Sequence, residues 1–240
     1  MTAQTSTLAF TLKTKLDFKL NCSKLTPNNL AGLTIDQIAK LKLGESKYAP
    51  QVTDFFTIHF EKMNQKDKFG ENTQHIAFKN SSKNMDFIGA TMSQGAITVC
   101  GDAGDRLGDK MRRGVILVEG DVGDYAGSRM VAGTIGILGK TGAYTGFAMK
   151  RGTILLTQTP SLHATIQDCG THNLPFLSLL FNSFAENPKF SAIASTRVQR
   201  YAGDLSVNGN GEILVIQSWF FDLNQPIKFN ACSNNAKILF

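Results

Sequence analysis

The feature that most constrains the fold of this chain is a repeat of nineteen residues between Asp86 and Leu156. Aligned repeats share a methionine column, an isoleucine column and a second aliphatic column. In that order the columns are Met92, Met111, Met130 and Met149; Ile97, Ile116, Ile135 and Ile154; Val99, Val118, Ile137 and Leu156. A fixed period of this length indicates a repeat architecture, in which each unit buries its apolar face only against its neighbours.

Glycines recur with the same period and use fourteen of the chain's 22 glycines. Their columns are Gly89, Gly108, Gly127 and Gly146; Gly95, Gly114, Gly133 and Gly152; Gly101, Gly120 and Gly139; Gly104, Gly123 and Gly142. Glycine tolerates backbone conformations in which a Cβ would clash, so these columns indicate the corners of a repeating object.

The pattern predicts a mainly β fold, namely a right-handed parallel β-helix with about 19 residues per coil. Side chains alternate across a strand, so the isoleucine column and the second aliphatic column point inward. The two ends need caps. We expect an N-terminal cap of strands and a short helix at residues 1–70, the repeats at 71–160, and a C-terminal cap with a helix and final strands at 161–240.

Local signals place elements inside these caps. The alternating segments 8–13 and 16–20 are expected to form a hairpin. Thr34 is expected to begin a short helix, because it precedes apolar residues that recur every three positions. Pro175 is expected to open a second helix, laid over the end of the rod. The period itself ends after Thr157.

Charge and cysteine spacing limit the classes of partner and metal site that we expect for this chain. The net charge is +6, but no basic run is interleaved with aromatic residues, so we expect no nucleic-acid partner. The four cysteines lie far apart without a C-x-x-C motif, which argues against an iron–sulfur cluster or zinc site in this chain alone and fits a reducing cytoplasm. No apolar run has membrane length.

We expect neither catalytic nor metal-binding residues in this chain. The histidines are scattered and lie outside the repeat; they are His59, His75, His163 and His172. No serine or cysteine sits in a nucleophile elbow. The run GDAGDRLGD has the wrong spacing for calcium-binding nonapeptide repeats, so its aspartates are expected to be solvated corner residues that hydrogen-bond their own turns.

Two surface columns remain. The basic pairs Arg112–Arg113 and Lys150–Arg151 occupy the same positions two repeats apart, and they form either a solvated edge or a strip that holds an extended polyanion. Leu117, Leu138 and Leu155 fall on outward positions of the strands. Such exposed leucines imply a cover, either a partner subunit or the terminal segments of this chain, and we expect all three to form a partner interface in the native complex.

With these residues described, a family resemblance can be stated. The GDxGDxxGxxMxxGxIxVxG repeats resemble the GXGXG β-helix domain found in the glutamate synthase large subunit and in the C subunit of formylmethanofuran dehydrogenase. The flanking LTPNNLAGLTIDQIAKLKL and QRYAGDLSVNGNGEILV look like the C subunit of the formyltransferase/hydrolase complex of methylotrophic bacteria.

This resemblance implies a non-catalytic, cytoplasmic member of a heteromer that also contains the A, B and D subunits, for instance a dimer of heterotetramers. The complex would move formyl from tetrahydromethanopterin to a methanofuran-type carrier and release formate, with a metal in its amidohydrolase-like subunit. A polyglutamylated carrier would bring carboxylates near Arg112, Arg113, Lys150 and Arg151. Two alternatives stay open: a subunit of a molybdenum or tungsten formylmethanofuran dehydrogenase, and a glutamate-synthase-like domain.

Overall fold

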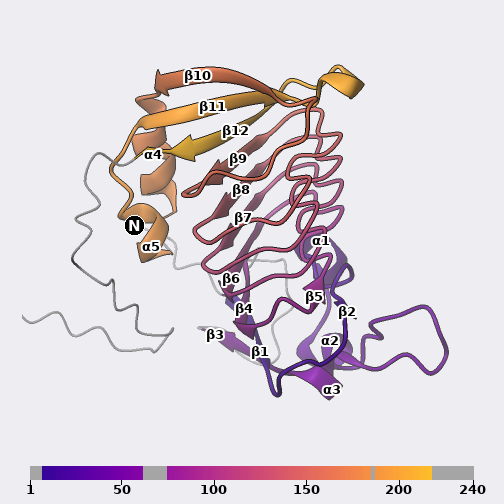
Figure 1. Ribbon diagram of the computed structural model, residues 1–240. Helices are drawn as coiled ribbons and strands as arrows, with labels where there is room; N and C mark the ends of the chain where they lie inside the picture. Colours follow the sequence, from indigo (N-terminus) through magenta and orange to yellow (C-terminus); the bar gives the residue numbers. More distant parts are fainter. Residues whose placement is uncertain (1–6, 62–74, 185–186, 218–240) are drawn as a thin grey trace, which may run out of the picture.

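A computed structural model describes residues 7–61, 75–184 and 187–217 (Figure 1). The strands are β1 (Thr7–Leu12), β2 (Leu20–Asn21), β3 (Phe56–Glu61), β4 (His75–Ser81), β5 (Met85–Asp86), β6 (Ala96–Gly101), β7 (Val115–Val118), β8 (Thr134–Ile137), β9 (Thr153–Leu156), β10 (Gln167–Asn173), β11 (Arg197–Gly203) and β12 (Gly211–Ile216). The helices are α1 (Pro27–Leu30), α2 (Ile35–Ala39), α3 (Val52–Phe55), α4 (Phe176–Ser183), α5 (Pro188–Ser191) and the 3-10 helix η1 (Leu205–Val207).

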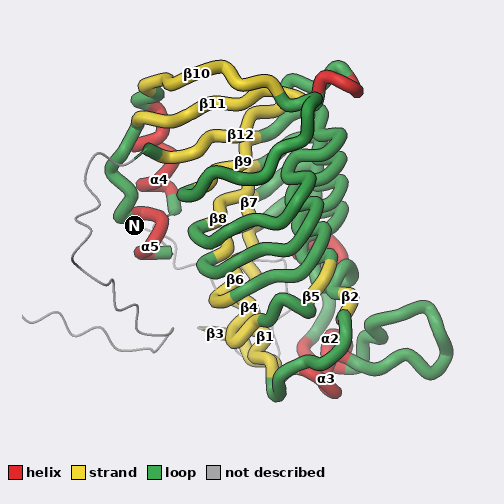
Figure 2. The backbone as a smooth tube through the Cα atoms, in the orientation of Figure 1, coloured by secondary structure: helices red, strands yellow, loops and turns green. Residues whose placement is uncertain are grey.

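One ten-stranded sheet runs through the whole described structure, in the order β10-β11-β12-β9-β8-β7-β6-β4-β1-β3. Its middle is parallel, from β1 through β4, β6, β7, β8 and β9 to β12. Its ends are antiparallel, because β3 pairs with β1, and β11 pairs with both β12 and β10. Figure 2 shows that loops and turns, rather than further strands, make up most of each repeat outside this sheet.

The predicted right-handed parallel β-helix is therefore wrong. The structure is a large mixed sheet with few helices, an α/β-type arrangement. Each repeat contributes one strand of four to six residues, and outside it the only strand-type pairings between these described repeats are the isolated bridges Ala103↔Val122 and Val122↔Thr141. Residues with positive φ, such as Arg106 and Lys110, bend the backbone in the turns, and this conformation does not extend a strand.

The predicted interior columns are confirmed. All four methionines of the repeat are fully buried, as are the isoleucine column and the second aliphatic column. Pairing is in register, so Ile116 lies opposite Ile97 and Ile135, and Ile213 of β12 continues the column beyond Ile154. Identical side chains stacked in this way form one continuous core.

Glycine is required where the turns approach this core. Gly108 has φ +64°, and a Cβ added there would lie 2.6 Å from Cδ1 of Ile135 in the next repeat. The glycine column that begins at Gly89 therefore makes room for the isoleucine column.

The N-terminal segment differs in part from its prediction. The expected hairpin is wrong, because β1 pairs with β3 and β4, whereas β2 pairs with β5. The short helix is confirmed as α2, where Thr34 and Gln37 form a capping box. The predicted boundary between residues 70 and 71 lies outside the described residues, and the sheet continues on both sides of residue 160.

The C-terminal helices cover the outer face of the sheet. Helix α4 begins after Pro175 as predicted, but it packs along this face instead of over the end of the rod. Figure 1 shows α4 and α5 beside the strands on the left of the view. Phe190 of α5 lies on Gly136 of β8, where an added Cβ would come within 2.6 Å of the ring. Because Gly136 has no side chain, Phe190 and with it α5 can pack directly against the sheet.

We expect Gly136→Ala to destabilise the chain by about 1–3 kcal/mol, because the ring of Phe190 has to move out of a packed site. Denaturant unfolding measures this effect. The double variant Gly136→Ala/Phe190→Leu should lose less than the sum of its single changes, since the smaller side chain leaves room for the Cβ. Simple additivity of the two changes would contradict the contact.

Candidate functional site

One surface column of the repeat turns joins aromatic rings with an arginine. The column consists of Phe87, Arg106, Tyr125 and Tyr144, each with φ near +60°. The guanidinium of Arg106 lies 4.9 Å from the ring centre of Tyr125 and 5.9 Å from that of Phe87. Tyr125 and Tyr144 stack at 5.0 Å. A cation between aromatic faces is held in place by the ring quadrupoles, so the column is preorganised.

His163 lies beside the end of this column, nineteen residues after Tyr144. Its carbonyl accepts the N–H of Ile166, just as the carbonyl of Tyr144 accepts the N–H of Phe147. Its ring lies 6.2 Å from Tyr144 and 5.5 Å from Phe147. The period is lost after Thr157 as predicted, because β12 takes the place of a further repeat strand beside β9 and His163 lacks the positive φ of the column. The spacing from Tyr144 was the signal that could have identified His163.

Asp204 lies at the C-terminal end of the turn stack, which is the row of consecutive repeat turns. Its buried carboxylate accepts hydrogen bonds from the N–H of Ala148 at 2.9 Å and from the N–H and hydroxyl of Ser206. In earlier repeats a backbone carbonyl fills this role, since the N–H of Arg129 bonds to Phe147. His163 Nε2 lies 3.4 Å from Asp204 Oδ2, close enough for an ion pair when protonated, but the two atoms form no hydrogen bond.

Electrostatics identify Asp204 as an ionised group. Burial would raise the pKa of this carboxyl, but hydrogen bonds from Thr165, Ser206 and the N–H of Ala148 lower its pKa from 3.8 to about 2. Thr165 also bonds through Oγ1 to His163 Nδ1 at 2.7 Å. Nothing in the sequence pattern singled out Asp204, because it lies outside the repeat and its partners come from three separate segments.

The aspartates of the repeat hold successive turns together. Asp86 accepts the N–H of Asp105, Asp105 accepts that of Asp124, and Asp124 accepts that of Ala143. A second column joins Asp102 to Asp121 and Asp121 to Lys140. These aspartates bond the turn of the following repeat rather than their own turn. Lys19 of the N-terminal segment binds both Asp86 and Asp105.

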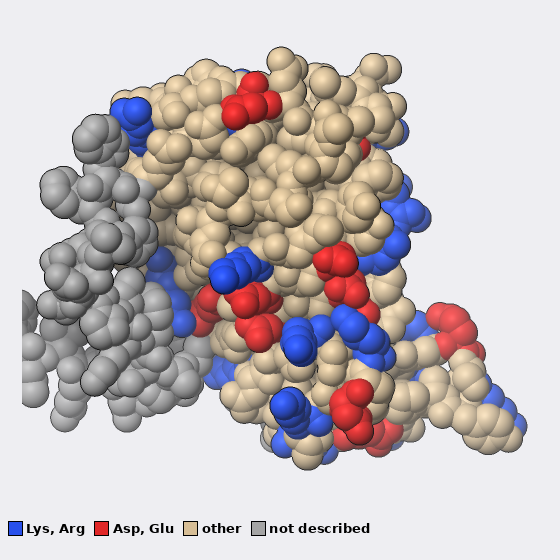
Figure 3. All heavy atoms as spheres, in the orientation of Figure 1, with Lys and Arg blue, Asp and Glu red and all other residues tan. Residues whose placement is uncertain are grey.

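The four basic residues predicted as a site are all exposed. The backbone of Arg112 bonds to Met92, and that of Lys150 bonds to Met130, so the two pairs occupy equivalent corners with the Val131 repeat between them. In Figure 3, Lys and Arg side chains lie at the right-hand margin, where the repeat turns are in Figure 1, and mixed charges cover the lower part.

The outward leucines are covered within the chain. Leu117 and Leu155 are buried in a cluster with Leu177, Phe181 and Phe190, and Leu138 packs at its margin. The C-terminal segment of this chain, rather than the expected partner interface, therefore lies over Leu117 and Leu155. Glu119 fixes this segment, because its carboxylate accepts from Asn187 at 3.2 Å and from Lys189 at 2.6 Å.

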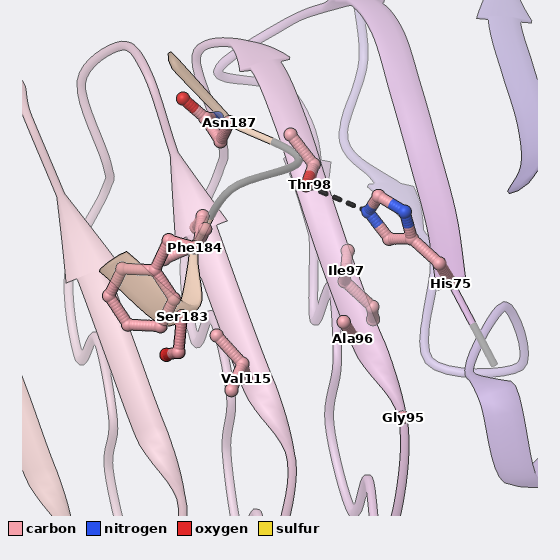
Figure 4. Close-up of a pocket in the computed structure, with 10 residues that line it drawn as sticks. His75, Gly95, Ala96, Ile97, Thr98, Val115, Ser183, Phe184 and Asn187 are labelled. Carbon is pink, nitrogen blue, oxygen red and sulfur yellow. Dashed lines mark hydrogen bonds between the residues drawn. The ribbon is translucent and has the colours of Figure 1, made fainter. Parts of the chain in front are cut away.

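A pocket of about 270 Å³ lies between this segment and the outer face of β4, β6 and β7 (Figure 4). Its walls include Val115, Leu117 and Phe184. His75 Nε2 and Thr98 Oγ1 share a hydrogen bond of 2.9 Å at one side, and His75 Nδ1 bonds to Thr7. The histidine edge is thus engaged within the chain, and the remaining surface suits a small apolar group.

Within the described segments, no group of three or more His, Cys, Asp or Glu residues is placed to hold a metal ion. Across the same residues, none of the helices has the length and apolar composition needed to cross a membrane.

Comparison with known proteins gives a likeness in fold. No protein-family model matches the sequence, and no curated protein matches it. Among solved structures, the chain is similar to a chain in the formyltransferase/hydrolase complex (FhcABCD) from Methylorubrum extorquens, determined with methylofuran. The TM-score is 0.50 at 24% identity, over 88% of this chain and 100% of that chain. At this identity the likeness shows that the two chains share a fold.

Proposed function

We propose that this chain is a structural, non-catalytic member of a cytoplasmic formyltransferase/hydrolase complex, together with the A, B and D subunits. The observation that carries this proposal is the fold shared with a chain of FhcABCD over that chain's whole length. The complex would pass formyl from tetrahydromethanopterin to a methanofuran-type carrier and release formate. A metal in the amidohydrolase-like subunit would serve the hydrolysis.

The chemistry of the described residues supports a structural role. The aspartates of the repeat accept backbone N–H groups of the following repeat. Asp204 ends the turn stack, and Glu119 anchors the C-terminal segment. These side chains are engaged in holding the fold, so a rigid scaffold between catalytic subunits is the role they fit best.

Reconstitution with and without this chain tests the proposal. We expect the other subunits to lose formyl transfer when the chain is omitted and to regain it when the chain is added, because the scaffold positions two active sites. The isolated chain serves as the control and should show no activity. The structural role would be contradicted if the other subunits assembled without this chain into a complex that had the same activity and the same composition in those subunits.

A second part of the proposal concerns the basic corner. Arg112, Arg113, Lys150 and Arg151 would contact the polyglutamyl tail of the carrier through charge-assisted hydrogen bonds. Exposed pairs contribute about 0–1 kcal/mol each, so replacing all four by Gln should weaken carrier binding by roughly tenfold at low salt.

Carrier binding by the assembled complex measures this effect, with a carrier that lacks the tail as one control. Four exposed lysines elsewhere provide the matched variant when changed to Gln; they are Lys15, Lys40, Lys47 and Lys83. Equal losses in the two variants, or a loss that does not depend on the tail, would refute the contact.

A further inference from the structure

Exposed aromatic side chains gather on the turns of consecutive repeats. Tyr144 is 44% exposed and Phe147 is 40% exposed. Both rings contact Tyr125 of the preceding turn, at 5.0 Å and 5.9 Å between ring centres. Their backbone is fixed, because the carbonyl of Phe147 accepts the N–H of Arg129 at 2.7 Å. An apolar patch that stays in water on a rigid frame marks an interaction site.

The repeat turns that carry this patch are rich in basic residues. The turns at 105–113, 124–132 and 143–151 contain seven basic residues and three aspartates, so they carry +4 of the chain's net +6. The basic residues are Arg106, Lys110, Arg112, Arg113, Arg129, Lys150 and Arg151. The aspartates are engaged within the chain: Asp105 with Lys19, Asp109 with Ser128 and Arg129, and Asp124 with Ala143. The surface therefore presents a positive rim to solvent.

The ring geometry selects among polyanionic partners. Arg106 lies over one face of Tyr125, and Tyr144 stacks on the other face. Single-stranded nucleic acid needs free aromatic faces on which its bases can stack, whereas the ring of Tyr125 is already contacted by both Arg106 and Tyr144. Tyrosine and arginine around an apolar centre are instead typical of the well-packed core of a protein interface.

We propose that these residues form a docking surface, the turn patch, for a partner protein that presents an apolar contact ringed by Asp and Glu. Tyr144 and Phe147 form its centre, and Arg106, Lys110 and Arg129 form its rim, so the four basic residues of the corner stay available to a carrier tail. The inference rests on the proposed function, because the partner is another member of the complex. An oligoglutamate chain would engage the rim alone, so the centre distinguishes a protein partner from a carrier tail.

Three double variants of the full chain test the turn patch in the reconstituted complex. The first, Tyr144→Ser/Phe147→Ser, removes the centre, and the second, Arg106→Glu/Lys110→Glu, reverses part of the rim. The third is a matched control, Lys47→Glu/Tyr48→Ser, in a loop where Tyr48 is 89% exposed. Thermal unfolding confirms that each variant folds. Binding to the partner subunits is then measured at low and high salt, with poly-L-glutamate and single-stranded RNA as separate probes.

We expect the first two variants to weaken binding to the partner subunits by tenfold or more and the control to leave it unchanged. The rim effect should shrink at high salt, whereas the centre effect should persist. Wild-type assembly by both variants would overturn the turn patch alone. The turn patch would also be overturned if the centre variant assembled normally while the rim variant lost binding to poly-L-glutamate or RNA. A wild-type chain that joins none of the subunits would contradict the proposed function and the turn patch together.

Discussion

Replacing Asp204 by alanine is expected to lower the free energy of unfolding by about 3–5 kcal/mol, because it leaves the buried N–H groups of Ala148 and Ser206 without an acceptor. His163 would also lose the carboxylate beside its ring. Urea unfolding at neutral pH measures the loss. The matched control is Asp17→Ala, an exposed aspartate whose removal makes the same change in charge and should cost less than about 0.5 kcal/mol.

The stability difference between wild type and Asp204→Ala is expected to depend on pH. The pKa of Asp204 falls from 3.8 to about 2 on folding, so between these values the unfolded chain binds more protons. The stabilisation from this group is complete above pH 3.8 and is lost as pH falls toward 2. It amounts to about 2 kcal/mol. The stability difference between wild type and Asp204→Ala should therefore narrow by about this amount between pH 5 and pH 2. A constant difference over that range would contradict the assignment.

Ile135→Asp is expected to abolish soluble folding. Ile135 is fully buried between Ile116 and Ile154 in the stacked column, so a carboxylate there would have no polar partner and would cost several kcal/mol. Ile135→Val, which keeps the shape of the column, should cost only about 0.5–1.5 kcal/mol.

Soluble yield and denaturant unfolding of the two variants measure this difference. The valine variant controls for expression, because it changes the same codon without adding charge. An aspartate variant that unfolds at the wild-type urea concentration would show that the isoleucine column is not the core of the chain.

The sequence predicted the core better than it predicted the architecture. Periodic methionines and isoleucines have only one way to avoid water, which is to stack on their equivalents, so their burial could be read from spacing alone. Nothing in that spacing states how many strands each repeat contains. The glycine-rich turns, bonded through aspartates such as Asp105, took the place of the further strands that a β-helix would need.

The site was less predictable because its contacts join residues that are far apart in the sequence. Asp204 meets Ala148 across 56 residues, and Asn187 meets Glu119 across 68, so no local pattern announces either contact. The hairpin failed for a related reason. β1 pairs with β3 along one edge and with β4 along the other, and both partners are more than 40 residues away from it in the sequence. His163, in contrast, had a visible signal in its nineteen-residue spacing from Tyr144.

Native mass spectrometry of the assembly purified through a tag on this chain tests the central claim most directly, because it reports composition without assuming a partner. We expect one hetero-oligomer that contains this chain together with formyltransferase and amidohydrolase-like subunits, and that dissociates more readily after reversal of charge at Arg106 and Lys110. Recovery of this chain alone, or only as copies of itself, under conditions in which the other subunits are soluble would contradict the proposed role.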